Sequence, residues 1–211
     1  MSSLNKDYAK PLAIELFSGT ESFSKVWREN GGKSFTIDIN HKFKPDLRKN
    51  IREVTLEDIP EEFRKPDVIW ASPPCTTFSV ASIGKHWKHG MPSKQAQIGN
   101  ELLMHTLRLI NLLRPKYWFI ENPRGMMRTL PIMNALPKNT VTYCQYGDSR
   151  MKPTDIWNNA EWVAKSPCKN GDACHVSAPR GARTGTQGLK GNAIRSVIPT
   201  DLIQEIIGAI K

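Results

Sequence analysis

The chain has 211 residues, of which 39% are hydrophobic and 24% charged, a composition that suits one globular domain with a sizeable core. With 30 Lys and Arg against 20 Asp and Glu, it carries a formal net charge of +10. This charge predicts attraction to polyanions, with nucleic acid as the first candidate. Charge alone leaves open the alternative of a solvated basic surface without a specific partner.

No apolar run approaches the ~20 residues that span a bilayer, and residues 1–10 contain no signal-peptide core. We therefore expect no membrane association and a cytoplasmic location. The four cysteines are too few and too irregularly spaced for a disulfide framework: Cys75, Cys144, Cys168 and Cys174. Reduced thiols are expected.

Short apolar strands alternate with helical patterns in β-α-β order, which predicts an α/β fold with a Rossmann-like, mostly parallel sheet and helices on both faces. In chain order, the expected strands are 11–17, 34–39, 67–71 and 115–121, with a further element at 139–147. A helix is expected at 22–30, another after Gly99-Asn100 and an amphipathic one at 199–210.

In such sheets ligands bind beyond the carboxyl ends of the strands. Gly19 follows the first strand and allows a tight turn, whereas Asp38 closes the second, where a carboxylate can accept hydrogen bonds from ribose hydroxyls. A plain turn and a surface aspartate are the alternatives. Together the two residues indicate a nucleoside-containing cofactor, although "GTES" is not the pattern of dinucleotide binders.

Two further strand ends carry chemistry. "SPPC" places Cys75 behind two prolines, and "ENPRG" places Glu121 at the end of an apolar strand that Asn122-Pro123 should stop. Burial should raise the pKa of Glu121, which suits it to share or donate a proton. An ordinary helix N-cap at Asn122 is the alternative interpretation.

The motifs "LFSG", "IDIN", "SPPCTTFS", "ENPRG" and "GNAIRSVIP" occur in the order and rough spacing seen in DNA cytosine-C5 methyltransferases. The chain resembles a compact, phage-type member of that family over nearly its whole length. The resemblance implies the class I methyltransferase fold, S-adenosylmethionine as cofactor, DNA as substrate and a place in restriction-modification.

The resemblance also implies the catalytic residues. Cys75 is expected to add to carbon 6 of cytosine, and Glu121 to bind nitrogen 3 and the amino group. Lys152 or Arg150 is expected at the carbonyl oxygen, because "YGDSRMKPTDIW" stands where the family has Gln-x-Arg-x-Arg.

By the same resemblance, the expected cofactor-binding residues are Phe17, Ser18, Gly19, Asp38, Ile39, Asn50, Pro74, Asn100, Asn192 and Ala193. Three positions depart from the family pattern. Glu21 replaces a glycine, which predicts weaker cofactor binding, and Asn50 replaces an aspartate that faces the adenine. Thr76 replaces a glutamine, which leaves open how the gap left by a flipped base is filled.

We expect residues 1–157 to form the catalytic core, 158–190 a short basic segment in place of a target-recognition domain, and 191–211 a C-terminal helix that completes the core. The expected nucleic-acid-binding residues are Ser79, Arg124, Arg180, Arg183, Thr186, Gln187 and Lys190. So short a segment predicts rudimentary sequence recognition or a separate specificity partner. The target base must be flipped out or already single-stranded.

Three alternatives remain at this level. Cys168, Cys174 and His175, with Cys144 as a fourth ligand, could bind zinc, but their spacing is wide and neighbouring side chains rarely share a centre, so no metal is expected. The chain could be a catalytically weakened, regulatory relative, or its substrate could be RNA or a free nucleotide. The sequence determines neither the target sequence nor the oligomeric state.

Overall fold

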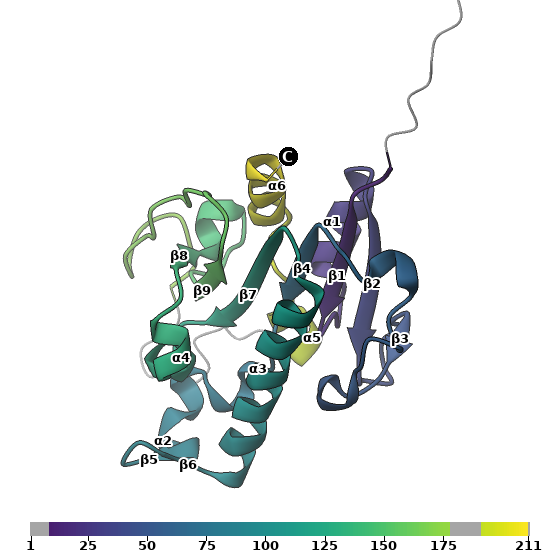
Figure 1. The fold of residues 1–211 in the computed structure, drawn as a ribbon. Coiled ribbons are helices and arrows are strands. Elements are labelled where there is room, and N and C mark those ends of the chain that lie inside the picture. Colours follow the sequence, from purple (N-terminus) through teal and green to yellow (C-terminus); the bar gives the residue numbers. More distant parts are fainter. Residues whose placement is uncertain (1–8, 178–190, 211) are drawn as a thin grey trace, which may run out of the picture.

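The computed structural model describes residues 9–177 and 191–210. Their centre is a seven-stranded sheet in the order β3-β2-β1-β4-β7-β9-β8 (Figure 1). The strands are β1 Leu12–Leu16, β2 Lys33–Asp38, β3 Leu47–Arg48, β4 Val68–Ala71, β7 Tyr117–Pro123, β8 Lys138–Thr142 and β9 Pro153–Asn158. A small separate hairpin pairs β5 Trp87–Lys88 with β6 Met91–Pro92.

The strands from β3 to β7 are parallel, whereas β9 runs antiparallel to both of its neighbours, β7 and β8. The strand order reverses at β1, which lies between β2 and β4. Ligands of open α/β sheets bind where the order reverses, beyond the carboxyl ends of the strands. The topology therefore places a ligand crevice after β1, β2, β4 and β7.

Helices cover both faces of the sheet (Figure 1). The α-helices are α1 Ser22–Glu29, α2 Ile83–His86, α3 Lys94–Leu113, α4 Pro131–Asn134, α5 Asn192–Ser196 and α6 Thr200–Ala209. Short 3-10 turns complete the fold: η1 Ile51–Glu53, η2 Glu61–Phe63, η3 Cys75–Thr77, η4 Val80–Ser82, η5 Met126–Thr129 and η6 Tyr143–Tyr146.

Alternate residues of β4 enter two separate apolar cores. Trp70 packs with residues of α1 and α6 on one face, and Ile69 packs with residues of α3 on the other. Both side chains are fully buried, as expected for a parallel strand covered on both faces. The C-terminal helix α6 thus completes one of the two cores.

The structure confirms the predicted mostly parallel sheet and its first four strands, but it corrects four details. The β-α-β order does not hold throughout. Between β2 and β4 the described chain contains β3 and the 3-10 turns η1 and η2, but no α-helix. Helix α3 begins at Lys94, before Gly99, whose added Cβ would lie 2.6 Å from Thr77 Oγ1. Strand β7 continues through Asn122 and Pro123, because β9 pairs with it there. The element at 139–147 divides into β8 and η6.

Within residues 9–177 and 191–210, no helix has the length and apolar character needed to cross a bilayer.

Candidate active site

Of the two residues with the strongest predicted roles, Glu121 lies on β7 and Cys75 lies on the loop that follows the neighbouring strand β4. Ala71 of β4 is in register with Ile120 of β7, so the loop that follows β4 lies beside Glu121. Cys75 opens the turn η3 in that loop and is exposed, whereas Glu121 is only 6% exposed. The parallel pairing therefore brings an accessible thiol and a buried carboxyl to the same edge of the sheet.

Close backbone contacts join the Cys75 loop to the end of β7. The amide of Asn122 donates from Nδ2 to the carbonyl oxygen of Pro73 at 2.8 Å, and the Met126 N–H donates to the carbonyl oxygen of Phe78 at 2.6 Å. A Cβ on Gly125 would lie 2.1 Å from that same Phe78 oxygen. Only glycine fits at position 125, because the backbone of Phe78 comes too close for a Cβ. Asn122 orients the Cys75 loop and does not cap a helix.

Glu121 has a partner that the sequence analysis did not identify. Tyr143, on η6, donates its hydroxyl to Glu121 Oε1 at 3.0 Å. Burial and the negative charge of Glu121 raise the pKa of Tyr143 well above its ordinary value, so the hydroxyl remains a donor. Nothing in the sequence pattern indicates this contact, because Tyr143 lies in the middle of the predicted element 139–147.

Lys152 supplies the positive charge beside this pair. Its Nζ lies 4.4 Å from the centre of the Tyr143 ring and donates to the carbonyl oxygen of Arg195 at 3.0 Å. Burial lowers the pKa of Lys152, and the negative charge of Glu121 opposes that change. The backbone of Lys152 has φ 31°, in the left-handed region, so the surrounding loop holds this residue under strain.

The thiol of Cys75 is exposed at one side and desolvated by the loop at the other. This desolvation, with the negative charge of Glu121, raises the pKa of Cys75, whereas the charges of Lys152 and Arg195 lower it. The net direction is upward. At neutral pH the resting side chain is therefore a thiol, and positive charge is needed to favour the thiolate.

Arg150, the alternative to Lys152, is occupied by other contacts. It forms a buried ion pair with Asp148, and its guanidinium donates to the carbonyl oxygens of Arg195 at 3.1 Å and Val197 at 3.3 Å. These bonds tie the loop before β9 to the end of α5 and to the residue that follows it. The geometry favours Lys152 over Arg150 as the cation beside Tyr143 and Glu121.

At the carboxyl ends of β1 and β2, a backbone turn fixes the expected ribose-binding residue. Asp38 accepts from the Gly19 N–H at 2.8 Å and from the Asn40 N–H at 2.7 Å, one bond to each carboxylate oxygen. Gly19 has φ 47°, which favours glycine. A carboxylate has lone pairs beyond these two bonds, so Asp38 can also accept from a ligand hydroxyl.

Other predicted cofactor-binding residues have unpaired polar atoms or an exposed side chain. Ser18 Oγ and Asn100 Oδ1 are buried and have no hydrogen-bond partner within the described residues, and Ile39 is 63% exposed just after β2. Unpaired buried polar atoms and an uncovered apolar side chain fit a polar ligand with an aromatic ring. Asn50 Oδ1 accepts from the Arg52 N–H at 3.2 Å, which leaves it one lone pair for the adenine amino group.

The remaining predicted residues are only partly described. Phe17 is half-buried with φ 58°, Pro74 is exposed beside Cys75, and Asn192 and Ala193 belong to α5. Ser79 is half-buried and bridges to Gly125, and Arg124 is exposed. Five predicted DNA contacts lie outside the described residues: Arg180, Arg183, Thr186, Gln187 and Lys190.

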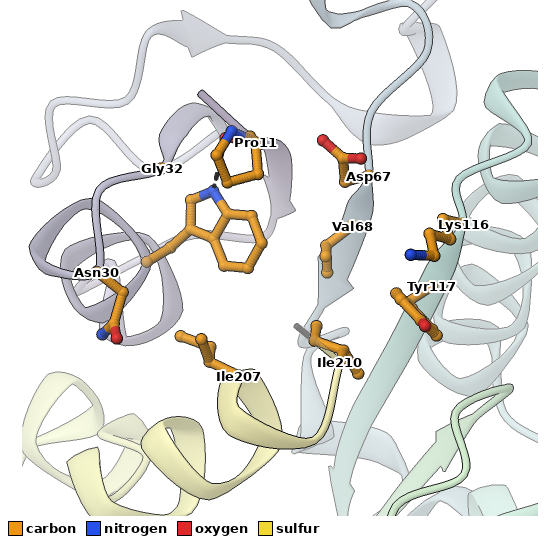
Figure 2. A pocket seen from close by; sticks show the side chains of 10 residues that line it. Pro11, Asn30, Gly32, Asp67, Val68, Lys116, Tyr117, Ile207 and Ile210 are labelled. Atoms are coloured by element: carbon orange, nitrogen blue, oxygen red, sulfur yellow. Dashed lines mark hydrogen bonds between the residues drawn. The ribbon is translucent and has the colours of Figure 1, made fainter. Parts of the chain in front are cut away.

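A cavity of about 190 Å³ lies elsewhere, at the amino ends of the strands (Figure 2). Its lining includes Pro11, which precedes β1, the first residues of β4 and β7, and the side chains of Trp27, Ile207 and Ile210. Cys75 and Asp38 belong to the opposite edge of the sheet. We therefore do not assign the cofactor to this cavity.

A doubly wound sheet with one antiparallel strand and polar residues after β1, β2, β4 and β7 defines a class I methyltransferase fold. A solved structure supports this class: a prophage-encoded protein of E. coli described as a DNA modification methyltransferase. It matches with a TM-score of 0.53 and 19% identity, over 71% of this chain and 46% of that one. At this identity the match shows the fold alone.

Sequence comparisons define the family. Residues 12–133 match the family described as C-5 cytosine-specific DNA methylase. A Frog virus 3 protein named "Probable DNA (cytosine-5)-methyltransferase" is 30% identical over 92% of this chain and 97% of its own length. The Type II methyltransferase M.Bsp6I of Bacillus sp. is 31% identical over 53% of this chain but only 32% of its own. The chain belongs to the C-5 cytosine-specific DNA methylase family, as the motifs predicted.

Proposed function

We propose that the protein transfers a methyl group from S-adenosylmethionine to carbon 5 of cytosine in DNA through a covalent bond between Cys75 and carbon 6 of the base. The observation that carries the proposal is that an exposed thiol, on the loop after β4, and a buried carboxyl, on the neighbouring parallel strand β7, lie at the same edge of the sheet, where the charge of Lys152 acts on both. An inert structural cysteine would be buried among apolar side chains instead.

The crevice after β1 and β2 would hold the cofactor, which supplies a methyl group on a positively charged sulfur. The unpaired atoms of Ser18 and Asn100 and the remaining lone pairs of Asp38 offer hydrogen bonds to its polar parts. Ile39 offers an apolar surface for the adenine ring. These four residues bind and orient the cofactor.

The thiolate of Cys75 adds to carbon 6, the π electrons of the carbon 5–carbon 6 bond shift to carbon 4–carbon 5, and those of the carbon 4–nitrogen 3 bond shift to nitrogen 3. Carbon 5 is then nucleophilic enough to bond to the methyl carbon while the bond from that carbon to the cofactor sulfur breaks, so that the sulfur would leave as a neutral thioether. Loss of the carbon 5 proton to a base, followed by departure of the Cys75 thiolate, restores the ring. Glu121 holds nitrogen 3 and the amino group during these steps, and the Tyr143 hydroxyl fixes the position of Glu121.

We assign Lys152 two tasks. Its positive charge lowers the pKa of Cys75, which increases the thiolate fraction, and it stabilises the negative charge that the addition pushes toward the carbonyl oxygen. Lys152→Met should therefore slow methylation by about 10²-fold, as loss of one donor to a developing oxyanion does. Lys152→Arg, which keeps the charge, should retain part of the rate.

DNA containing 5-fluorocytosine tests the covalent step, because fluorine cannot leave as a proton does and the enzyme stays attached. With S-adenosylmethionine present, the adduct should survive denaturation and map by mass spectrometry to the peptide that contains Cys75. Cys75→Ser should abolish both adduct and methylation. Thr76→Ser, on the same exposed turn, is the matched control and should retain both.

Parallel reactions with duplex DNA, single-stranded DNA and RNA identify the substrate. An adduct on RNA alone would contradict DNA as the substrate, and a Cys75→Ser protein that still methylates carbon 5 would refute the covalent mechanism. A wild-type protein that binds S-adenosylmethionine but methylates none of the three would support a regulatory relative and contradict the proposal.

A further inference from the structure

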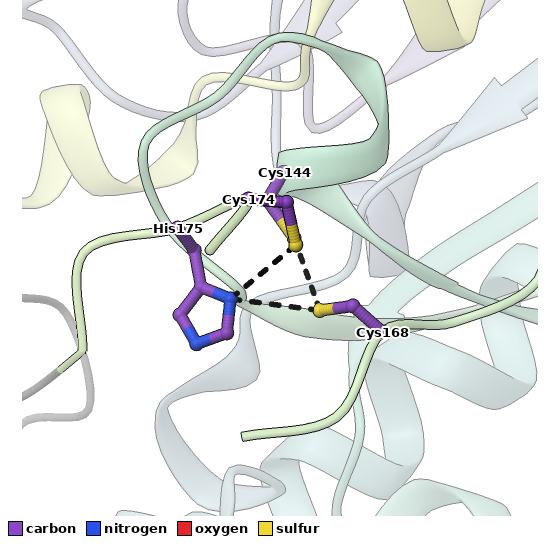
Figure 3. Close-up of side chains that lie close together, drawn as sticks. All are labelled: Cys144, Cys168, Cys174 and His175. Atoms are coloured by element: carbon purple, nitrogen blue, oxygen red, sulfur yellow. Dashed lines mark hydrogen bonds between the residues drawn. The ribbon is translucent and has the colours of Figure 1, made fainter. Parts of the chain in front are cut away.

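Three cysteines and one histidine that play no part in the proposed chemistry converge on one point (Figure 3). Cys144 lies on η6, and Cys168, Cys174 and His175 lie on the irregular segment that follows β9. One ligand atom from each residue lies within 4.8 Å of every other. The spacing of these residues along the sequence argued against a zinc site, but the fold brings them together. Cys144 comes from a different element, and the chain turns between Cys168 and Cys174.

Three of the distances between the ligand atoms match the edges of a tetrahedron around one metal ion, and a fourth is shorter. A zinc ion with sulfur at about 2.3 Å and nitrogen at about 2.0 Å requires edges of about 3.5–3.8 Å. Cys174 Sγ lies 3.6 Å from Cys144 Sγ and 3.6 Å from His175 Nδ1, and Cys168 Sγ lies 3.7 Å from His175 Nδ1. Cys144 Sγ and Cys168 Sγ are 3.1 Å apart, shorter than such an edge but longer than the ~2.05 Å of a disulfide.

The groups around the three sulfurs are polar, as expected for thiolates and not for cysteines packed in an apolar core. Gln145 donates from Nε2 to Cys174 Sγ at 3.5 Å, a hydrogen bond that a metal-bound sulfur can accept. His175 Nδ1 faces the sulfurs, and its Nε2 is buried without a hydrogen-bond partner within the described residues. Three sulfurs and one imidazole nitrogen form a complete protein ligand set, typical of structural zinc sites.

We propose that Cys144, Cys168, Cys174 and His175 bind one structural zinc ion. The ion joins the segment 165–177 to η6 and adds to the hydrogen bonds that Lys165 donates to the Tyr146 hydroxyl at 2.9 Å and to the Gln145 carbonyl oxygen at 3.1 Å. The Cys168 N–H donates to Thr142 Oγ1 at 3.0 Å, and the Val176 N–H donates to the carbonyl oxygen of Ser149 at 2.9 Å. Because segment 165–177 has no regular secondary structure, metal coordination replaces the backbone hydrogen bonds that a helix or strand would supply.

The test is the zinc content of the full-length protein, purified without chelator and measured by elemental mass spectrometry. About one zinc per chain is expected for the wild type. Cys168→Ser and Cys174→Ser should each bind at least about ten-fold less zinc, because a fully protein-ligated site needs all four donors. Cys75→Ser removes the one cysteine outside the cluster and should keep the zinc.

Two further measurements separate loss of metal from loss of fold. His175→Cys preserves four donors and should retain zinc, whereas His175→Ala should lose it while circular dichroism still shows the folded sheet. Cobalt reconstitution should give the thiolate charge-transfer band and visible bands of a tetrahedral site, absent in Cys174→Ser. A wild-type protein with no zinc and four free thiols, or with a Cys144–Cys168 disulfide, would overturn the proposal.

Discussion

The two halves of the site hold their acidic side chains in different ways. After β1 and β2, backbone N–H groups bind the carboxylate. Beside β4, β7 and β9, another side chain binds it. Asp38 accepts from the backbone of Gly19 and Asn40, and its neighbour Ile39 is exposed. Glu121 is buried and accepts from the Tyr143 hydroxyl. A turn thus arranges the half proposed to bind the cofactor (the cofactor half), whereas buried charges govern the half proposed to bind the base (the base half).

This difference follows from what each half must do. A cofactor that is bound and released needs shape and a few hydrogen bonds, which a rigid turn offers at little cost in burial. A covalent step needs a nucleophile and a neighbouring acid or base whose pKa values differ from their ordinary ones, and such shifts require desolvation and nearby charge. Changes in the base half should therefore alter rate, and changes in the cofactor half should alter stability or affinity.

The largest expected effect is in the base half, at Gly125. Gly125→Ala would place a Cβ 2.1 Å from the carbonyl oxygen of Phe78 and push the Cys75 loop away from β7. We expect a loss of about 1–3 kcal/mol in the free energy of unfolding and about 10²-fold in kcat, since small misplacements of reacting groups are costly. Urea unfolding and single-turnover methylation measure these effects.

The matched control is Gly84→Ala on α2, where an added Cβ would meet nothing within 4 Å. It should leave both stability and rate unchanged. Equal losses in the two variants would show that the contact between Gly125 and Phe78 does not position the Cys75 loop.

Glu15, on β1, joins the strand before Gly19 to the helix that follows it. Its buried carboxyl accepts from the N–H groups of Phe23 at 3.3 Å and Ser24 at 2.8 Å, at the start of α1. Burial raises the pKa of Glu15 from 4.5 to about 7, and the hydrogen bonds with Ser24 and Phe23 only partly oppose this. The folded protein thus keeps a proton that the unfolded chain releases between these two pH values.

The free energy of unfolding should therefore fall as pH rises from 4.5 to about 7, by about 3 kcal/mol, since one pKa unit corresponds to about 1.4 kcal/mol. Glu15→Gln removes this contribution. The free energy of unfolding of the variant, relative to wild type, should be higher at pH 8 than at pH 4.5 by that amount. Urea unfolding at both pH values measures it, and a constant difference would contradict the shifted pKa.

A change at Tyr143 tests whether its contact with Glu121 affects the rate of methyl transfer. Tyr143→Phe removes the hydroxyl that donates to Glu121 at 3.0 Å, a bond to a charged group whose loss costs about 1.5–3 kcal/mol. We expect kcat to fall by about 10-fold or more and KM for S-adenosylmethionine to stay unchanged.

Tyr146→Phe is a close control. Tyr146 is also buried on η6 and donates its hydroxyl to the carboxylate of Glu205 at 3.0 Å. It should lower stability similarly without lowering kcat. A comparable fall in kcat in both variants would assign the effect to the packing of η6 and not to Glu121.

The sequence predicted the sheet and the positions of Cys75, Glu121, Gly19 and Asp38, because apolar runs mark strands and the residues after parallel strands share one edge. It missed the contact of Tyr143 with Glu121, and it missed strand β9 altogether, because residues 153–158 contain no apolar run of the expected kind. The convergence of Cys144 with His175 depends on two segments meeting beside β8, a long-range contact that spacing along the chain does not encode.

The smallest effect is expected at Glu21, in the cofactor half, where the family has a glycine. Glu21 has φ 56°, a conformation that glycine adopts without strain, but its carboxylate also pairs with Arg28 at 2.5 Å. The ion pair is partly exposed, so its loss should cost at most about 1 kcal/mol, and relief of the left-handed backbone should offset it. Glu21→Gly should therefore change stability by less than about 1 kcal/mol.

Cofactor affinity should respond more clearly, because Glu21→Gly removes negative charge and a side chain from the turn that holds Gly19. We expect a few-fold tighter binding of S-adenosylmethionine in calorimetry, with kcat unchanged, since the base half is untouched. Glu21→Gln separates the two causes, because it removes the charge and keeps the side chain. If Glu21→Gly leaves affinity unchanged, the ion pair with Arg28 already neutralises this carboxylate, and the departure from the family pattern has no effect on the cofactor.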